Sequence, residues 1–180
     1  MTDRAMSPSS APSWPVDIHA ALNAASVRQV AYVPDAGHAR LIDLCAADRA
    51  MTMVPLTSEE EGVAVLAGAW LGGVRGVLLM QSSGLGNCVN MLSLARTCRF
   101  PLLMLVTMRG QWGEFNPWQV PMGQVAPEIV RACGGLTLPL EQAEAAGETM
   151  TAAARMAFEG QAIVAILIAQ RLIGAKTFGD

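Results

Sequence analysis

The stretch Ser58–Asn90, SEEEGVAVLAGAWLGGVRGVLLMQSSGLGNCVN, decides the fold of this chain. It begins with an acidic helix start, in which Ser58 is a favourable N-cap residue and Glu61 completes a capping box. The small residues within Gly62–Ala69 predict a thin helix that lets another backbone or a ligand approach closely. The apolar run Gly76–Met80 predicts a buried strand, after which a glycine-containing loop opens a second helix.

The rest of the chain repeats this alternation of helices and apolar strands. The pattern predicts an α/β fold, a single domain with a parallel sheet and helices on both faces. Residues Met1–Ser13 are polar and predict a disordered tail, so we place the domain at residues 14–180. Ligands bind beyond the carboxyl ends of parallel strands, which places the loops after Val33, Met80 and Thr107 on one functional edge. Besides the helix that starts at Ser58 and the strand Gly76–Met80, we expect helices over Trp14–Ala25, Ala39–Ala47, Asn87–Thr97, Gly123–Cys133 and Leu140–Glu159, and strands over Arg28–Val33, Met51–Leu56, Pro101–Thr107, Gly134–Pro139 and Ala162–Ile168.

The composition indicates a protein with extensive subunit contacts. Of the 180 residues, 52% are hydrophobic and 15% are charged, whereas a typical soluble domain has about 25% charged residues. Part of the apolar excess belongs to a sheet that is buried on both faces. We expect the remainder to lie in subunit interfaces, so the chain is predicted to form a homo- or hetero-oligomer.

Charge and segment patterns exclude several functional classes. A net charge of −3 leaves no basic stripe for nucleic acid. No apolar run approaches the roughly 18 residues of a membrane span, and no signal pattern opens the chain, so we expect a cytoplasmic protein without membrane contact. The four cysteines show no metal-ligand spacing and favour small buried groups over ligands or disulfides, at Cys45, Cys88, Cys98 and Cys133.

A long irregular segment, Arg109–Met122, carries two tryptophans and a phenylalanine. A loop of this length in a compact domain is usually either functional or disordered. Because Trp112, Phe115 and Trp118 would be wasted in a mobile loop, we expect an ordered loop that packs on a partner subunit or roofs the site. Hydrophobic packing within the loop itself is the alternative.

Three segments of the central stretch resemble the pyrimidine-binding domain of thiamine diphosphate (ThDP, also called thiamine pyrophosphate) enzymes. They are Glu60-Glu61-Gly62, Gly68-Ala69-Trp70 and Gln81–Asn87, and the earlier Val33-Pro34-Asp35 agrees with them. Among ThDP-dependent 2-oxo acid decarboxylases, the likeness is strongest to the alpha subunit of sulfopyruvate decarboxylase and the matching half of phosphonopyruvate decarboxylase. It covers nearly all of the chain after the first dozen residues.

The resemblance implies a role for one glutamate at the helix start. In that family such a glutamate binds N1′ of the aminopyrimidine, and counting back from Trp70 places it at Glu60. A carboxyl group that shares a proton with N1′ makes the 4′-amino group of the ring a competent base. Burial against the ring should raise the pKa of this glutamate, and the helix dipole should limit the rise. A shift of register by one residue would make Glu61 the cofactor residue.

The resemblance implies further contacts along the functional edge. Substrate contacts are expected from His38, Arg109 and Gln81, because an arginine or histidine there would face a small anionic 2-oxo acid. The alternative for Arg109 is a surface ion pair, and for the serines and asparagine it is the bonding of backbone groups in a turn. The expected cofactor contacts are Glu60, Pro34, Ser82, Ser83, Gly84 and Asn87.

The residues of the SSGLGN segment argue against a phosphate-binding loop. The segment is expected to join a strand to a helix N-terminus, as phosphate-binding loops do. However, the dinucleotide pattern GxGxxG would need glycine at the position of Val89, and a P-loop lysine is missing.

One motif of full-length ThDP enzymes is missing from the chain. A Gly-Asp-Gly segment followed by asparagine holds the metal and the diphosphate in that family, whereas the one Gly-Asp here is Gly179-Asp180. The resemblance therefore implies a partner, a diphosphate-binding beta subunit that carries this motif and Mg²⁺, with ThDP shared between the two chains.

These observations favour the pyrimidine-binding subunit of a split ThDP-dependent decarboxylase. By resemblance, its substrate is sulfopyruvate, with phosphonopyruvate or another small anionic 2-oxo acid behind it. A second hypothesis is a non-catalytic assembly or regulatory subunit that kept the fold. A third is a flavodoxin-like binding module, which the missing phosphate-loop residues disfavour.

Overall fold

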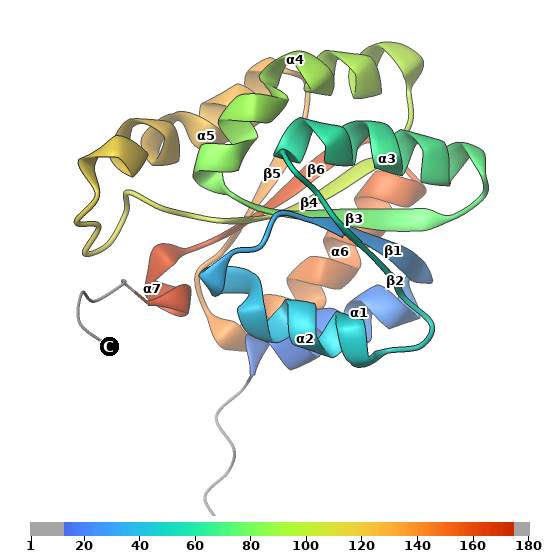
Figure 1. The fold of residues 1–180 in the computed structure, drawn as a ribbon, viewed down its shortest axis with the longest axis horizontal. Coiled ribbons are helices and arrows are strands. Elements are labelled where there is room, and N and C mark those ends of the chain that lie inside the picture. The colour runs from blue at the N-terminus through green and yellow to red at the C-terminus, as the bar shows by residue number, and fades with distance from the viewer. Residues whose placement is uncertain (1–12, 175–180) are drawn as a thin grey trace, which may run out of the picture.

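A computed structural model describes residues 13–174, and its centre is a six-stranded parallel sheet (Figure 1). The strand order is β2-β1-β3-β4-β6-β5. Every pair of neighbouring strands is parallel, so all six carboxyl ends lie at one edge. The strands are β1 (Val27–Tyr32), β2 (Thr52–Pro55), β3 (Arg75–Gln81), β4 (Leu102–Thr107), β5 (Leu136–Leu140) and β6 (Ile163–Ile168).

Helices cover both faces of this sheet, as the alternating pattern predicted. Figure 1 shows α3, α4 and α5 on one face and α1, α2 and α6 on the other. Short 3-10 turns η1 (Ala36–His38), η2 (Pro117–Gln119) and η3 (Ala143–Ala145) precede three of the helices. The helices are α1 (Trp14–Ala24), α2 (Ala39–Ala47), α3 (Glu59–Leu71), α4 (Ser82–Cys98), α5 (Val120–Ala132), α6 (Ala146–Phe158) and α7 (Gln170–Ile173).

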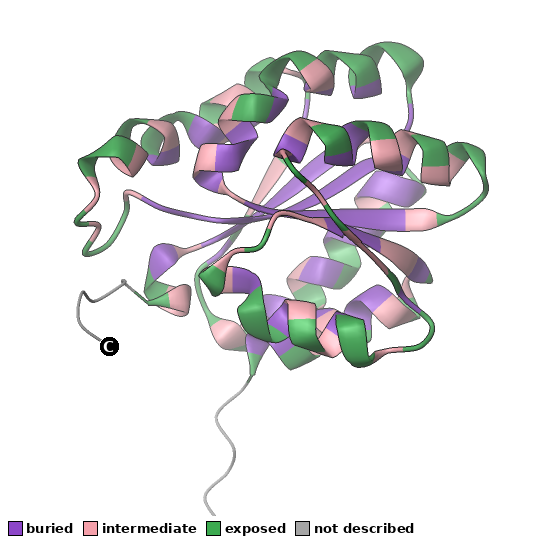
Figure 2. Cartoon of the chain, in the orientation of Figure 1, coloured by how far each residue is buried: buried purple, intermediate pink, exposed green. Residues whose placement is uncertain are grey.

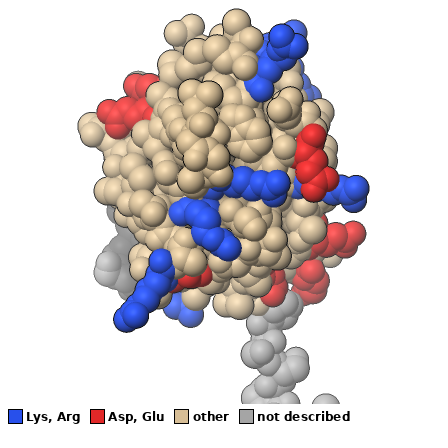
Figure 3. All heavy atoms as spheres, turned by 90° about the vertical axis from the view of Figure 1, so that its right-hand side faces the viewer, with Lys and Arg blue, Asp and Glu red and all other residues tan. Residues whose placement is uncertain are grey.

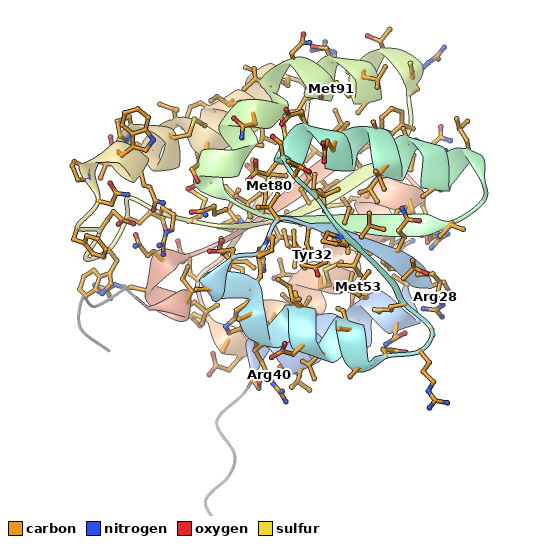
Figure 4. The ribbon with its side chains drawn as sticks, in the orientation of Figure 1. Arg28, Tyr32, Arg40, Met53, Met80 and Met91 are labelled. Atoms are coloured by element: carbon orange, nitrogen blue, oxygen red, sulfur yellow. The ribbon has the colours of Figure 1, made fainter. Side chains whose placement is uncertain are left out.

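Two hydrophobic cores lie on opposite sides of the sheet. Every residue of β4 and β6 is buried, and Figure 2 shows this central purple band between helices whose outer faces are green. Successive residues of a strand point to opposite faces, so Leu79 belongs to the core under α1, α2 and α6, and Met80 to the core under α3 and α4. Figure 4 shows Met80 on the α4 side and Tyr32 and Met53 on the α2 side.

The structure corrects the expectation of a loop at SSGLGN. The segment is the start of α4, which is helical from Ser82 and therefore begins five residues before the expected Asn87. Gly84 is at the third helical position, where a β-carbon would overlap the Glu59 carboxylate. Close packing rather than turn geometry therefore accounts for this glycine. Three further differences are α5, which begins at Val120 instead of Gly123, α6, which begins at Ala146 instead of Leu140, and the unexpected short α7.

The start of α3 differs from a capping box. Ser58 is the N-cap residue, but its side chain makes no cap hydrogen bond. Its hydroxyl instead donates to the Glu60 carboxylate, and Glu61 accepts from the backbone N–H of Thr57 at 2.9 Å. The predicted helix start is therefore right, whereas the predicted reciprocal hydrogen bonds are wrong.

Of the predicted tail, Met1–Ser13, the structure describes only Ser13. Gly179-Asp180 also lies outside the described residues.

Two glycines of α3 should respond to alanine in opposite directions. A β-carbon at Gly62 would overlap Leu78 Cδ1 in the core, whereas one at Gly68 would meet no heavy atom within 4 Å. We expect Gly62→Ala to lower the free energy of unfolding by about 1–3 kcal/mol through overpacking. Gly68→Ala should raise it by about 0.5–1 kcal/mol because alanine favours the helix. Urea unfolding of the isolated chain measures both, and equal effects would contradict this packing.

Candidate active site

The carboxyl ends of β1, β3 and β4 meet at one edge, which confirms that the segments after these strands lie at the same edge of the sheet. Thr107 Oγ1 at the end of β4 donates to Asp35 Oδ2 after β1, at 2.6 Å. The backbone N–H of Arg109 donates to Ser82 Oγ after β3, at 3.1 Å. The segments that follow β1, β3 and β4 are thereby tied together at the edge where parallel sheets bind ligands.

Three consecutive acids at the start of α3 have three different environments. Glu59 is buried, with 7% exposure, and accepts from Asn87 Nδ2 at 2.8 Å. Glu61 is exposed and accepts from the Thr57 N–H. Glu60 is half-buried, and the Ser58 hydroxyl donates to its carboxylate. A hydroxyl can rotate to another acceptor, so the Glu60 carboxylate is the acid best placed to exchange its partner for a ligand.

The surroundings favour the ionised form of Glu60 in this chain. The Ser58 hydroxyl bond, followed by the backbone N–H of Glu60 itself, lowers the pKa of Glu60 below its ordinary value, against a small opposing effect of burial. The expected rise in this pKa requires a ring packed against the carboxylate, so it concerns the cofactor complex. The free chain presents an anionic acceptor.

The first turn of α4 completes the acidic end of the site. Ser82 is fully buried, and its hydroxyl is used by Arg109. Ser83 is half-buried, and Asn87 is exposed one turn later, where its amide donates to Glu59. Ser83 and Asn87 therefore reach the surface, whereas Ser82 and Gly84 shape the packing beneath it.

Arg109 forms a buried ion pair instead of the surface ion pair considered from the sequence. Its Nε lies 3.7 Å from Glu114 Oε2, and both side chains are 5% exposed. The same Nε donates to Gln119 Oε1 at 2.9 Å. Burial acts against ionisation of Glu114, but the Asn116 N–H, the Gln170 amide and the Arg109 charge outweigh it and lower its pKa.

Side-chain amides form hydrogen bonds with Arg109 and with Glu114, and so connect this ion pair to its surroundings. Gln119 Nε2 donates to Gln81 Oε1 at 3.2 Å, at the end of β3. Gln170 Nε2 donates to Glu114 at 3.0 Å, and its Oε1 accepts from the N–H groups of Gln111 and Trp112 at 2.9 and 3.0 Å. Sequence reasoning missed Glu114, Gln119 and Gln170, because polar residues far apart in the chain carry no local signal for such a network.

His38 lies beneath the edge and has no exposed surface. Its Nε2 lies 3.2 Å from the Met80 carbonyl and 3.1 Å from the Leu105 carbonyl, so this nitrogen carries the proton and donates. Among the buried side-chain polar atoms of the described residues, only its Nδ1 lacks a partner. We therefore assign His38 to linking β3 and β4, and this geometry gives no support for the expected substrate contact.

Two hollows lie along the same edge of the sheet. One of about 450 Å³ is lined by Pro34, Tyr32 and Asp35 from the end of β1 and by Asp43 of α2. Another of about 640 Å³ lies at Trp112 and Arg171, whose guanidinium carbon stands 3.8 Å from the centre of the indole ring. The acidic turn of α3 lines neither of these two hollows.

Within residues 13–174, no helix is long and apolar enough to cross a membrane. Over the same residues, no group of three or more His, Cys, Asp or Glu side chains is placed to hold a metal ion.

Comparison with known proteins assigns much of the chain to a described family. Residues 17–119 match the family model "Thiamine pyrophosphate enzyme, N-terminal TPP binding domain". The chain is 41% identical to sulfopyruvate decarboxylase subunit alpha of Methanothermobacter thermautotrophicus over 115 residues, which are 63% of this chain and 70% of the relative. The corresponding subunit of Methanocaldococcus jannaschii is 35% identical over 117 residues, 64% of this chain and 69% of the relative.

A longer protein and a solved structure extend these similarities. Phosphonopyruvate decarboxylase of Streptomyces viridochromogenes is 39% identical over 119 residues, which are 65% of this chain and 30% of that protein. The 2-oxoglutarate:ferredoxin oxidoreductase of Magnetococcus marinus superposes with a TM-score of 0.70 at 14% identity, covering 89% of this chain and 29% of that one. The second similarity concerns the fold alone.

The buried histidine should make stability fall as the pH is lowered. Burial lowers the pKa of His38, against the Asp35 charge and the two carbonyl bonds, which raise it. Below its ordinary pKa of 6.5, the unfolded chain takes up a proton that the folded chain resists, so the unfolded state is favoured. One such proton changes the free energy of unfolding by at most about 1.4 kcal/mol per pH unit.

We expect His38→Gln, which keeps a donor for the two carbonyls, to flatten the decline of melting temperature between pH 6.5 and 5. His19→Gln in α1 is the control; because His19 lies 3.1 Å from Asp48, an arrangement that favours a protonated ring, its loss should not flatten the decline. Identical pH profiles for the chain and for His38→Gln would contradict the assignment.

Proposed function

The chain belongs to the family of N-terminal TPP binding domains of thiamine pyrophosphate enzymes, and from this premise we propose that it is the pyrimidine-binding subunit of a split ThDP-dependent decarboxylase. Two relatives that it matches over about 70% of their length are named sulfopyruvate decarboxylase subunit alpha. This supports sulfopyruvate as the substrate, with phosphonopyruvate or another small anionic 2-oxo acid as the next candidates. The name "subunit alpha" also supports a second subunit.

The observation that carries the proposal is the hydrogen bonding of the Glu60 carboxylate, compared with that of its two neighbours. Glu59 is buried on Asn87, and Glu61 is bonded to the Thr57 backbone, whereas Glu60 is held by a rotatable hydroxyl. A carboxylate presented at a helix N-terminus, on the carboxyl edge of a parallel sheet, fits a ring nitrogen that must share a proton. These residues therefore fit the aminopyrimidine of ThDP, and we propose Glu60 as the catalytic residue.

The other candidate residues of this edge are of two kinds, those that we propose to contact cofactor or substrate and those that support the edge by packing. When bound, ThDP supplies the electron sink for the loss of CO₂ from a 2-oxo acid. We propose Ser83, Asn87 and Pro34, which reach the surface, as cofactor contacts, and Gln81, which is half-buried, as a substrate contact. Ser82, Gly84, His38 and Arg109 are buried and support the edge from below.

We propose that the diphosphate and Mg²⁺ are held by a partner subunit with the Gly-Asp-Gly motif, because the sequence has no such motif. A site shared between two chains also agrees with an acidic turn that lines neither of the hollows at Pro34 and Trp112. Figure 3 views the right-hand side of Figure 1, opposite the segment that precedes α5, and shows charged side chains scattered among uncharged ones.

Replacing Glu60 separates a cofactor role from a helix-start role. Glu60→Gln is nearly isosteric but cannot share the proton with N1′. We therefore expect decarboxylation by the reconstituted complex to fall about 10²-fold or more, as when a proton-transfer group is removed. The melting temperature should change little, because Glu59 and Glu61 still serve the helix start.

Glu61→Gln is the matched control and should change both quantities little. The decarboxylation rate and the melting temperature are measured for both variants in the complex. A collapse in Glu61→Gln instead would shift the assignment by one residue. Near-normal activity in Glu60→Gln, with assembly intact, would favour the non-catalytic assembly role.

The segment Arg109–Met122, which we call the aromatic loop, allows a test of the proposed partner surface. Trp118 is 86% exposed, yet its backbone N–H is bonded to Asn116 Oδ1 at 3.1 Å, and the next residue, Gln119, is bonded to Gln81 at the site. A large exposed aromatic side chain on a hydrogen-bonded backbone fits the kind of residue that is enriched at interface hot spots. We propose that it contacts the diphosphate-binding subunit.

We expect Trp118→Ala to weaken binding of that subunit by about tenfold or more, measured as Kd by titration calorimetry. Leu71→Ala is the control, because Leu71 is 87% exposed but lies at the far end of α3 from the acidic turn. Equal Kd values for Trp118→Ala and the original chain would rule out this surface.

A further inference from the structure

Glu59 is a buried acid in a place that the sequence pattern treated as a simple helix start. Its Oε2 accepts from Asn87 at 2.8 Å, and none of the ion pairs found among the described residues includes it. Its carboxylate fills the space beside the α4 backbone at Gly84, where a β-carbon would overlap it. We refer to Glu59, Gly84 and Asn87 together as the helix latch.

Two helix N-termini stabilise this buried carboxylate. Burying an unpaired acid is costly, but Glu59 is the first residue of α3 and packs against the third residue of α4. Both helix starts carry N–H groups without intrahelical partners and the positive end of a helix dipole. Glu59 is therefore an electrostatic link between the two helices as well as a packing group.

The charges of Glu59 and Glu60 both affect one thiol of α4. Burial raises the pKa of the Cys88 thiol to about 12, with further contributions from the charges of Glu59 and then Glu60. Both carboxylates thus act on one residue in the second turn of α4. Successive residues of a helix differ by about 100° in direction, so holding Glu59 inward sets the direction in which Glu60 leaves the helix.

We propose that Glu59 is a positioning residue, which fixes the first turn of α3 against α4 and thereby aims Glu60. The catalytic consequence rests on the proposed function, because it assumes that Glu60 binds the cofactor. The helix latch itself is a property of this chain alone and is tested without cofactor.

The first experiment is a double-mutant cycle on the melting temperature of the isolated chain. Gly84→Ala should lower it by roughly 5 °C or more, because the new methyl group meets the Glu59 carboxylate. In the Glu59→Ala background that space is open, so the same change should lower it by less than half as much. Equal effects in the two backgrounds would overturn the helix latch.

Gly86→Ala is the control, because its nearest neighbour is the flexible end of Met122 at 3.2 Å, and its effect should be the same in both backgrounds. If Gly84→Ala prevents folding, recovery of a folded chain by adding Glu59→Ala supports the helix latch. Failure of Glu59→Ala to restore folding counts against it.

The second experiment measures positioning in the complex reconstituted with the diphosphate-binding subunit and ThDP. Glu59→Gln keeps an oxygen that accepts from Asn87 and should retain kcat within about threefold. Glu59→Leu fills the space without an acceptor and should lower kcat by about tenfold or more, with little change in KM for the 2-oxo acid.

The outcomes distinguish the positioning role of Glu59 from the proposed function of Glu60. Normal kcat in Glu59→Leu, together with a large loss in Glu60→Gln, would overturn the positioning role while leaving the proposed function intact. Normal kcat in Glu60→Gln would overturn the proposed function, and the melting-temperature cycle would still decide whether the helix latch exists.

Discussion

Burial of the parallel sheet on both faces is the constraint on which the rest of the structure depends. β4 and β6 are buried along their whole length, so their backbone groups must be satisfied by neighbouring strands, and helices must cover both faces. Because all six strands run in one direction, every strand delivers the following segment to the same edge. The acidic turn, the start of α4 and the aromatic loop meet there as a consequence.

The edge is kept in shape by polar groups that are themselves buried. His38 joins the carbonyls of Met80 and Leu105, and Thr107 joins Asp35. On the other side, the Arg109–Glu114 pair and Gln170 fix the segment that presents Trp112 and Trp118. Buried networks whose members are nearly all satisfied are rigid, so a loop rich in exposed aromatic side chains keeps a defined conformation although its one regular element is the short turn η2 (Pro117–Gln119).

The same edge presents the acid for which we propose a cofactor role. In that proposal the acidic turn would share a proton with one ring of ThDP, and a partner subunit would hold the diphosphate, for which the sequence contains no Gly-Asp-Gly segment. The relatives named subunit alpha are matched over about 70% of their length, whereas only 30% of a phosphonopyruvate decarboxylase is matched. This difference in length is what one expects if a function held in one chain in some relatives is divided between chains in others.

The amino-acid sequence determined the order of strands and helices, the parallel sheet and the edge on which the site lies. These follow from local hydrophobic patterns, which are read within a single element. The family resemblance of the acidic turn and of Gln81–Asn87 was also visible in the sequence, and the matched family agrees with it. The choice of Glu60 over Glu61 rests on the family resemblance, by counting back from Trp70, and the chain geometry adds a reason to prefer Glu60.

Only the tertiary structure decided what each polar residue of the edge touches. The SSGLGN segment reads as a loop because glycine and serine disfavour helices, yet α4 starts at Ser82, where Gly84 leaves room for the Glu59 carboxylate of another helix. Arg109 and His38 read as exposed site residues, but they are buried by partners that are between 5 and 67 positions away in the chain. Such contacts depend on which residues the fold brings close in space, and local sequence patterns do not reveal this.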